Sequence, residues 1–401
     1  MPKKYDYVIV GAGVIGLTVA WELKKRNISC TIVILEKEPV VGVHASGRNS
    51  GVLHSGIYYG SDTLKARVCS SGARIMKDFA VEHDIAVVQS GKVIIATSAD
   101  DLLTIDRLLK NAKDNNINAR KLNAAEVKEI EPYANPYQSG IYSPDTAVID
   151  SKGVIKKLFM LLQEKGVEFK FNSPLLGQDI KQRIVITPDE KISYGYLYNC
   201  AGANADVVAK LFGKSMSYSM IPFKGIYYKL HPNKKHLVNS SIYPVPNAKL
   251  PFLGVHLTRV ISGDIYVGPT AIPALGRENY RALEGIKIKE GIRIGSELAN
   301  MYLKNRENFR LLAHTEIKKY FKPWFVKSAQ NLVTGLEAKD LIPSNKVGIR
   351  PQLINVNTKT IEMDYIIEST QYSMHILNSI SPAFTSAFSF AEWIVDKSEE
   401  V

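Results

Sequence analysis

Residues 44–59 combine histidines with small and polar residues in a pattern suited to chemistry. The stretch reads His-Ala-Ser-Gly-Arg-Asn-Ser-Gly-Val-Leu-His-Ser-Gly-Ile-Tyr-Tyr, with His44 and His54 ten residues apart. Histidine titrates near neutral pH and therefore suits proton transfer. Small side chains let the backbone approach a flat ring closely. The pattern predicts a site at which such a ring meets one or both histidines.

A glycine-rich turn near the start of the chain predicts a dinucleotide-binding unit. A short apolar run over residues 7–10 leads into Gly11-Ala12-Gly13-Val14-Ile15-Gly16, and a helical pattern follows over 17–26. Gly11 allows a tight turn, Gly13 lets the backbone approach a pyrophosphate, and Gly16 lets the helix pack close to the strand. The helix N-terminus then offers free N–H groups to the phosphates.

An acidic residue completes this unit. A second strand, predicted over residues 31–35, ends at Glu36, twenty residues after Gly16. A carboxylate at this place can accept hydrogen bonds from both hydroxyls of a ribose. Lys37 follows directly, and we include it in the cofactor-binding set. The order strand, turn, helix, strand and acid distinguishes this motif from an isolated glycine turn.

The elements that must position these residues are spread along the chain. Helical patterns cover residues 100–114, 152–165 and 387–395, and strand patterns cover 91–96, 167–171, 196–200, 225–230 and 264–267. Strands that alternate with helices in this way are typical of α/β folds.

Composition narrows the class of protein. The chain has 401 residues, of which 45% are hydrophobic and 22% charged, and this balance excludes disorder, collagen and coiled coil. The formal net charge of +12 suggests anionic partners. The charge is spread along the chain without a recognised RNA-binding motif, so we expect no nucleic-acid partner. Three distant cysteines form neither a disulfide framework nor a zinc site, and no metal is predicted.

The start of the chain and the length of its apolar runs indicate where in the cell the protein is expected. The first residues lead directly into a strand, and no apolar run approaches about 20 residues, so we expect a cytoplasmic protein. Residues 318–327, Lys-Lys-Tyr-Phe-Lys-Pro-Trp-Phe-Val-Lys, form the longest mixed basic and aromatic stretch. This stretch is a solvated basic surface or, alternatively, a peripheral contact with the inner face of an anionic membrane. In the second case Trp324 and Phe325 insert while the lysines meet headgroups.

The chain resembles the D-amino-acid-oxidase-type superfamily of FAD enzymes, and within it the L-2-hydroxyglutarate oxidase/dehydrogenase branch. The resemblance runs over residues 5–390, and Ala20 and Leu23 after the glycine turn are typical of FAD rather than NAD proteins. Its motifs are residues 49–59, Leu64-Lys65-Ala66, Pro222-Phe223-Lys224-Gly225, residues 252–258, Gly268-Pro269, Gly348-Ile349-Arg350-Pro351, residues 375–378, Ser381-Pro382-Ala383 and Thr385-Ser386. The chain departs from the family pattern at Lys224 (usually Arg), Pro351 (commonly Ala), Arg48 (commonly His) and across residues 285–345.

The resemblance implies an α/β architecture with two interleaved domains. A Rossmann-type FAD-binding domain is expected from residues 1–88, 140–215 and 330–401. A smaller mixed-sheet α+β substrate domain is expected from residues 89–139 and 216–329. The strand over 196–200 would meet the adenosine end of the cofactor, and the turn at Gly202 would pass near the pyrophosphate.

The resemblance also implies a reaction, the FAD-dependent oxidation of L-2-hydroxyglutarate to 2-oxoglutarate. Hydride would pass from C2 to flavin N5, and the electrons would pass to oxygen or a quinone. The substrate is then a small dicarboxylic 2-hydroxy acid. Oxidation of glycerol 3-phosphate is the second candidate activity, because related enzymes share the Asn-Ser-Gly…His core. A flavin-dependent RNA-modifying protein is a third candidate, suggested by the net charge.

Residues of the substrate site have predicted catalytic or binding roles, and for His54 and Arg350 a purely structural role is the alternative. His54 is expected to be the general base, or else a structural histidine packed on the flavin. Arg350 is expected to clamp the carboxylate beside the reacting carbon, or else to form an ordinary ion pair. The second carboxylate is assigned to Lys224, His256 or Arg277, and Tyr58 is also assigned to substrate binding.

The remaining cofactor contacts come from the same resemblance. They are His44, Arg48, Asn49, Ser50, Gly51, Val52, Gly202, Ser381, Ala383, Thr385 and Ser386. His44 precedes Ala-Ser-Gly, where related amine-oxidising enzymes carry His-Ala-Ala-Gly and a covalently attached flavin, so attachment at His44 is the alternative to a polar contact. Residues 381–386 are expected to start the C-terminal helix, whose N-terminus would stabilise negative charge at flavin N1–O2.

Overall fold

The apolar runs near the start of the chain form the centre of an eight-stranded sheet. The computed structural model describes residues 2–247 and 250–400. β1 (Lys3–Val10) pairs in parallel with β2 (Ile32–Leu35) and with β12 (Lys191–Asn199). The strand order is β10-β11-β12-β1-β2-β9, and β21 and β20 add beside β12. The outer strands are β9 (Glu168–Lys170), β10 (Gly177–Asp179), β11 (Ile184–Ile186), β20 (Ile367–Thr370) and β21 (Ser373–Ile376).

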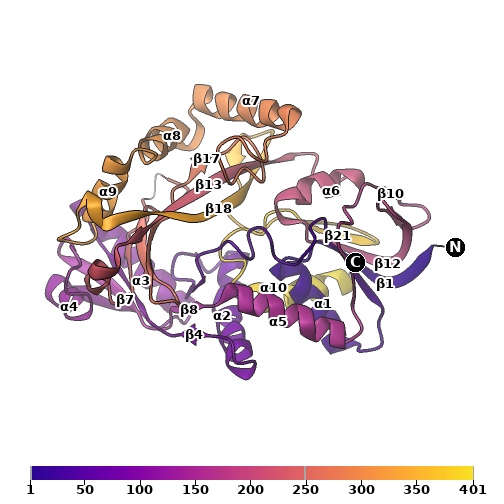
Figure 1. The fold of residues 1–401 in the computed structure, drawn as a ribbon, viewed down its shortest axis with the longest axis horizontal. Helices are drawn as coiled ribbons and strands as arrows, with labels where there is room; N and C mark the ends of the chain where they lie inside the picture. Colours follow the sequence, from indigo (N-terminus) through magenta and orange to yellow (C-terminus); the bar gives the residue numbers. More distant parts are fainter. Residues whose placement is uncertain (1, 248–249, 401) are drawn as a thin grey trace.

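Helices cover both faces of this sheet, as its fully buried central strands require. α1 (Val14–Arg26), α5 (Ser151–Glu164) and α10 (Ala387–Glu399) share one core with the face that carries Ile9. α6 (Ala205–Leu211) packs on the opposite face. α2 (Leu64–Glu82) contacts α10. Parallel strands joined by crossing helices confirm the Rossmann-type fold, which occupies the right-hand part of Figure 1.

A second, ten-stranded sheet forms the other lobe. Its order is β19-β18-β13-β16-β15-β14-β5-β7-β6, with β17 beside β13, and only the β14–β5 pair is parallel. The strands are β5 (Lys92–Ile95), β6 (Arg120–Asn123), β7 (Ser139–Ser143), β13 (Tyr218–Leu230), β14 (Ser241–Pro244), β15 (His256–Arg259), β16 (Ile265–Gly268), β17 (Ile272–Pro273), β18 (Leu341–Asn355) and β19 (Thr360–Ile361). The predicted mixed sheet is therefore confirmed.

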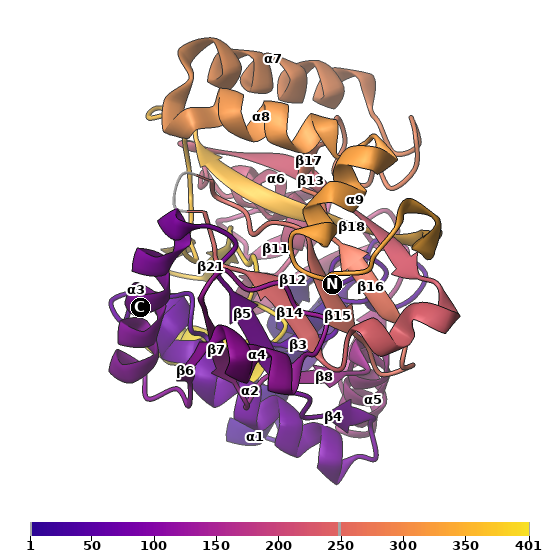
Figure 2. The same cartoon turned by 90° about the vertical axis from the view of Figure 1, so that its left-hand side faces the viewer.

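Helices also cover this second sheet. α7 (Ile288–Lys304), α8 (Phe309–Lys318) and α9 (Lys322–Gln330) form a row over β13 and β18 (Figures 1 and 2). α3 (Leu102–Asp114) and α4 (Ala124–Ile130) contact β7. The aromatic side chains of α9 are divided, because Phe325 is fully buried whereas Trp324 is exposed. Phe325 was therefore wrongly predicted as a membrane-inserting residue.

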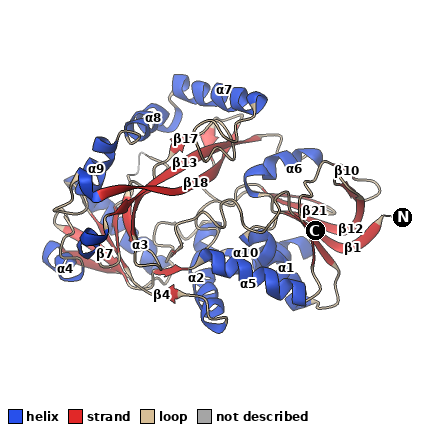
Figure 3. Ribbon diagram, viewed as in Figure 1, coloured by secondary structure: helices blue, strands red, loops and turns tan. Residues whose placement is uncertain are grey.

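A small third sheet lies where the two lobes meet (Figure 3). It consists of β3 (Val52–Leu53), β8 (Ala147–Ile149) and β4 (Val87–Val88). β3 directly precedes His54, so this sheet fixes the backbone next to the predicted general base.

The predicted helices and strands occur close to their expected places, but β7 and β18, from segments predicted for the cofactor domain, pair within the second sheet. β18 pairs with β13 from Tyr218–Asn355 to Leu230–Leu341, so it belongs to the second sheet. Residues 330–401 were predicted for the cofactor domain, but the pairing of β18 with β13 places β18 in the other lobe. The sequence did not reveal this pairing because the two strands lie far apart along the chain. The other predicted boundaries stay predictions.

Candidate active site

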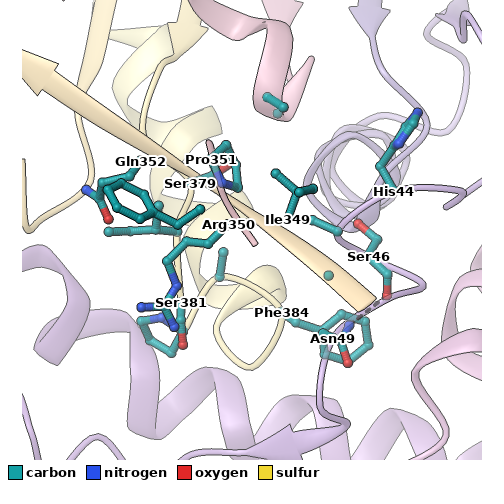
Figure 4. Close-up of a pocket in the computed structure, with 18 of the residues that line it drawn as sticks. His44, Ser46, Asn49, Ile349, Arg350, Pro351, Gln352, Ser379, Ser381 and Phe384 are labelled. Carbon is teal, nitrogen blue, oxygen red and sulfur yellow. Dashed lines mark hydrogen bonds between the residues drawn. The ribbon is translucent and has the colours of Figure 1, made fainter. Parts of the chain in front are cut away.

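The residues predicted for cofactor and substrate gather around one large cavity, of about 1160 Å³, lined from both lobes. Figure 4 shows Arg350 reaching from β18 toward the turn that holds Ser381, with His44 and Ser46 on the opposite side. The lining includes Gly11, Gly13, Glu36, Lys37, His44, Arg48, Asn49, Ser50, Val52, His54, Tyr58, Gly202, His256, Arg277, Arg350, Ser381, Ala383 and Thr385. Gly16, Gly51, Lys224 and Ser386 lie outside it.

The turn between β1 and α1 has the close backbone packing that a phosphate-binding turn requires. Gly11 has a φ of +105°, and a Cβ there would lie 2.6 Å from the carbonyl oxygen of Cys200. A Cβ on Gly16 would lie 2.0 Å from the carbonyl oxygen of Gly11. A side chain fits at neither position. The first turn of α1, which begins at Val14, therefore lines the cavity with its N-terminal end.

Glu36 stands at the end of β2 with its carboxylate buried. Its Oε2 accepts the N–H of Ala12 at 2.8 Å, and its Oε1 accepts the N–H of Glu38 at 3.0 Å. These bonds orient the carboxylate, and each oxygen keeps a lone pair for a ribose hydroxyl. The ammonium of Lys37 instead pairs with Glu38 and, at 2.6 Å, with Glu278.

The loop before β3 is held by its own hydrogen bonds. Asn49 Nδ2 donates to the Ser46 carbonyl at 2.7 Å, and Asn49 Oδ1 accepts the Gly51 N–H at 2.8 Å. The guanidinium of Arg48 lies 4.1 Å from the ring centroid of Tyr280. The loop thus keeps a fixed shape along the cavity.

His44 has protein partners on both ring nitrogens. Its Nδ1 lies 2.8 Å from the Tyr280 hydroxyl, and its Nε2 lies 2.9 Å from Glu38 Oε1. Both ring nitrogens are thus hydrogen-bonded within the protein. These contacts also bring Glu38, His44 and Glu278 together, and the ammonium of Lys37 supplies positive charge to both carboxylates.

The segment before α10 is a turn over residues 381–386, and the helix itself begins at Ala387. Thr385 Oγ1 accepts the His54 N–H at 3.2 Å and donates to the Val52 carbonyl at 3.3 Å. Ser386, the last residue of the turn, does not line the cavity, and its hydroxyl lies 2.8 Å from the Tyr365 hydroxyl. The turn therefore holds the backbone of His54 in place.

His54 lines the cavity, and its Nδ1 is buried with no hydrogen-bond partner in the described part of the chain. Burial, helped by nearby positive groups, lowers the pKa of His54 to about 3. Arg350 is one of these groups, and Lys92 and His256 act in the same direction when they are protonated. The ring is therefore neutral near pH 7, which is the state that accepts a proton.

Arg350 projects into the cavity, and no ion pair joins it to any of residues 2–247 or 250–400. Its guanidinium lies 5.2 Å from the ring centroid of Phe252. Burial lowers the pKa of Arg350, but a guanidinium stays charged at neutral pH. A planar cation without a protein carboxylate suits an anionic ligand.

Arg277 was wrongly predicted to bind the second carboxylate. Its guanidinium forms two hydrogen bonds with Asp206 and one with Glu290, and it also donates to the Ala203 carbonyl. A buried arginine held by two carboxylates has no charge left for a substrate. Its contacts instead tie its loop to α6, beside Gly202.

The geometry also argues against Lys224 and His256 as partners of that carboxylate. Lys224 lies outside the cavity lining, and its Nζ donates to Asn279 Oδ1 at 2.9 Å. His256 Nδ1 lies 2.9 Å from the Gly254 carbonyl, which can only accept, so this nitrogen carries the proton. Burial lowers the pKa of His256 to about 4, so the ring is neutral and its Nε2 is an acceptor. A neutral ring in this tautomer cannot donate to a carboxylate.

Three residues around the cavity had no predicted role. Tyr280 contacts His44 and Arg48, and it belongs to none of the recognised motifs. Lys65 is buried in the lining, where burial lowers its pKa to about 7, although its motif was recognised. Lys92 is fully buried at the start of β5. A lysine within an apolar strand was a readable signal, because lysine is rarely buried completely.

The cavity fits the cofactor that the sequence predicts. The glycine turn, the start of α1 and the Glu36 carboxylate match the phosphate and ribose groups of an adenine dinucleotide. The residues around His54 and Arg350 continue the same cavity into the second lobe. Within the described residues, none of the helices combines the length and the apolar character needed to span a bilayer.

Comparison with known proteins agrees with this geometry. The family model described as FAD dependent oxidoreductase matches residues 6–397. An L-2-hydroxyglutarate dehydrogenase of Escherichia coli K12 is 33% identical over 398 residues, which cover 98% of this chain and 93% of that protein. A mitochondrial L-2-hydroxyglutarate dehydrogenase of Homo sapiens is 31% identical, with coverage of 99% and 89%.

Solved structures share the fold at lower identity. L-alpha-glycerophosphate oxidase from Mycoplasma pneumoniae with FAD bound has a TM-score of 0.79 and 21% identity, covering 99% of this chain and 95% of the other. Glycine oxidase from Geobacillus kaustophilus has a TM-score of 0.72 and 16% identity, with the same coverage. The match to the family model over almost the whole chain decides the assignment: this chain belongs to the FAD-dependent oxidoreductase family.

Proposed function

We propose that this protein oxidises L-2-hydroxyglutarate to 2-oxoglutarate with FAD and passes the electrons to oxygen or a quinone. The observation that carries the proposal is that one cavity, continuous with the dinucleotide turn, contains both His54 and Arg350. Among the described residues, the neutral His54 has no partner for its Nδ1, and Arg350 has no ion pair. The L-2-hydroxyglutarate dehydrogenases that cover nearly the whole chain support the choice of substrate.

The two residues divide the work at the reacting carbon. Arg350 binds the carboxylate beside C2 with its planar donors and thereby orients the hydroxyl group. His54 accepts the hydroxyl proton. When bound, the flavin accepts the hydride that leaves C2. The contacts of His44 with Tyr280 and Glu38 support non-covalent binding of the flavin.

The second candidate, oxidation of glycerol 3-phosphate, rests on the shared fold with the glycerophosphate oxidase and on a cationic cavity that also suits phosphate. The third, an RNA-modifying flavoprotein, rests on the net charge alone. Three substrates distinguish these alternatives from the proposal. We expect L-2-hydroxyglutarate to bleach the flavin of the anaerobic holoenzyme, glycerol 3-phosphate to do so at least tenfold more slowly, and RNA to leave its spectrum unchanged.

The outcome is read by stopped-flow absorbance of the flavin. Faster reduction by glycerol 3-phosphate than by L-2-hydroxyglutarate would transfer the function to the second candidate. A wild-type flavin that no hydroxy acid reduces would refute the proposal.

The pH dependence of reduction follows from the lowered pKa of His54. Because burial and nearby cations hold this pKa at about 3, His54 stays neutral between pH 7 and pH 5. We therefore expect the ratio of the reduction rate constant to Kd to change less than threefold over this range. A histidine of ordinary pKa, about 6.5, would lose about 30-fold by pH 5. Stopped-flow reduction at intermediate pH values measures the ratio, and an acid limb between pH 6 and 7 would contradict the lowered pKa.

We also propose that the outer surface of α7–α9 makes a peripheral contact with an anionic membrane. Phe321 is 62% exposed and Trp324 is 49% exposed, and Ile288, Ile292 and Leu303 on α7 are exposed as well. Lys318 and Lys327 lie over the Trp324 ring, at 5.1 and 5.9 Å from its centroid. Lys319 takes no part, since it is buried in an ion pair with Glu316. Exposed aromatic side chains among lysines suit an interface of apolar chains and anionic headgroups.

The membrane contact predicts that the holoenzyme sediments with vesicles rich in phosphatidylglycerol and that high salt releases it. The double variant Phe321→Ser/Trp324→Ser should bind about tenfold more weakly, because two apolar anchors are lost. A matched variant, Tyr137→Ser, removes an exposed aromatic ring outside this surface and should bind like the wild type. Equal sedimentation of the double variant and the wild type would rule out this surface.

A further inference from the structure

One buried lysine has an ammonium group without a partner. The buried lysines are Lys24, Lys65, Lys92, Lys224 and Lys319. Four of them donate to carbonyl, amide or carboxylate oxygens. The Nζ of Lys92 is buried without any hydrogen-bond partner in the described residues. An ammonium ion removed from water without compensation is costly, so its retention calls for an explanation other than stability.

Lys92 lies one aromatic layer behind the substrate end of the cavity. Its Nζ is 4.7 Å from the ring centroid of Tyr58 and 4.9 Å from that of Tyr243, and both rings line the cavity. The Tyr58 hydroxyl is itself buried and unpartnered. Tyr243 stacks on His256, with ring centroids 3.9 Å apart. The ammonium therefore faces the cavity through two aromatic rings, which tolerate a cation on their faces.

No carboxylate of the described residues pairs with Lys92, and the two acidic groups that act on Arg350 and Lys65 are engaged with other partners. Glu316 holds Lys319 and the N–H of Ala271. Asp364 accepts the N–H groups of residues 64 and 65. Burial lowers the pKa of Lys92 to about 7, and no carboxylate of the described residues opposes this shift. A second carboxylate bound in the cavity would therefore favour the charged form of Lys92. Arg350 and the protonated form of Lys92 thus place two positive charges at the substrate end, and an acid with one carboxylate would balance only one of them.

We propose that Lys92 determines specificity, because its charge, acting through Tyr58 and Tyr243, favours ligands that carry a second carboxylate. This inference rests on the proposed function for the identity of the substrate. Lys92 replaces the three residues first assigned to the second carboxylate. Arg277 and Lys224 are hydrogen-bonded to protein groups, and His256 is an acceptor. Lys92 acts at a distance from the reacting atoms and is a positioning residue.

The test compares a dicarboxylate with a monocarboxylate that the enzyme cannot oxidise. Glutarate and butyrate are titrated into the oxidised holoenzyme, and the flavin absorbance reports each Kd. At an effective dielectric constant of about 20, attraction between two unit charges in the same site changes binding by about 10- to 30-fold. We expect the preference of the wild type for glutarate over butyrate to fall by about 10- to 30-fold in Lys92→Met. Lys92→Arg, which keeps the charge, should retain more of the preference.

Lys24→Met is the matched control, since Lys24 is also buried but lies on α1 and bonds the carbonyls of residues 28 and 30. It should keep the wild-type preference. Equal weakening of glutarate and butyrate by Lys92→Met, or a wild type without preference, would overturn the proposal. Loss of FAD or of the folded state in both Lys92→Met and Lys92→Gln would assign Lys92 a structural role and also overturn it.

The same experiment separates this inference from the proposed function. A wild type that prefers glutarate, loses that preference in Lys92→Met and yet is not reduced by L-2-hydroxyglutarate would support the role of Lys92 and refute the substrate. If L-2-hydroxyglutarate reduces the flavin but Lys92→Met keeps the wild-type preference for glutarate, the substrate is supported and the role of Lys92 is refuted.

Discussion

Replacing His54 by alanine is expected to slow flavin reduction by L-2-hydroxyglutarate about 10²- to 10⁴-fold, the usual effect of losing a general base. The reason lies in the state of the ring, which is neutral near pH 7 and has a buried Nδ1 without a partner. The FAD content of His54→Ala should stay near that of the wild type, because the glycine turn and Glu36 are untouched. The rate is measured by anaerobic stopped-flow absorbance at saturating substrate.

A second histidine variant serves as the control. His236 is exposed and packs on Tyr133, with ring centroids 5.4 Å apart, and it does not line the cavity. His236→Ala should reduce its flavin at the wild-type rate. If His54→Ala did so as well, His54 would be a structural residue and another group would have to take the proton.

Replacing Arg350 by methionine is expected to lower the ratio of the reduction rate constant to Kd about 10²- to 10³-fold. Truncating one partner of a buried, hydrogen-bonded charge pair costs about 2–5 kcal/mol, and the substrate carboxylate is the partner here. L-2-hydroxyglutarate and L-2-hydroxybutyrate should lose similar factors, because both carry a carboxylate beside the reacting carbon. Stopped-flow reduction over a range of substrate concentrations measures both ratios.

The conservative variant Arg350→Lys separates charge from geometry. Lysine keeps the positive charge but lacks the planar fork, so an intermediate loss is expected. If Arg350→Met affected only the dicarboxylic substrate, Arg350 would bind the second carboxylate instead of the first. If neither substrate were affected, Arg350 would not bind substrate.

The cofactor half of the molecule could be predicted well because its signals are local. Gly11, Gly13, Gly16 and Glu36 lie within one strand–turn–helix–strand unit, and each has a steric or hydrogen-bonding reason that a short sequence already contains. The apolar runs of β1 and β2 likewise mark strands that are buried on both faces. The sequence also identified His54 and Arg350 through short motifs, and the structure brings them to the same cavity.

The substrate half could be predicted less well because its partners are distant in the sequence. β18 pairs with β13 across more than a hundred residues, and no local pattern records that register. Arg277 carried the expected charge for a substrate site, but Asp206 and Glu290 occupy its guanidinium. Charge is a property of one residue, whereas availability of that charge depends on its neighbours in space.

The sequence by itself determined the fold class and the position of the dinucleotide turn, and it offered His54 and Arg350 as candidates for proton transfer and carboxylate binding. Only the tertiary structure decided which basic side chains of the second lobe are paired with protein groups and which are available to a ligand. It paired Arg277 and Lys224 with protein groups, fixed the tautomer of His256, and left Arg350 and Lys92 without an ion pair to any residue of 2–247 or 250–400. The physical reason is that burial makes an unpaired charge costly, so its pairing is decided by packing across both lobes and not by spacing along the chain.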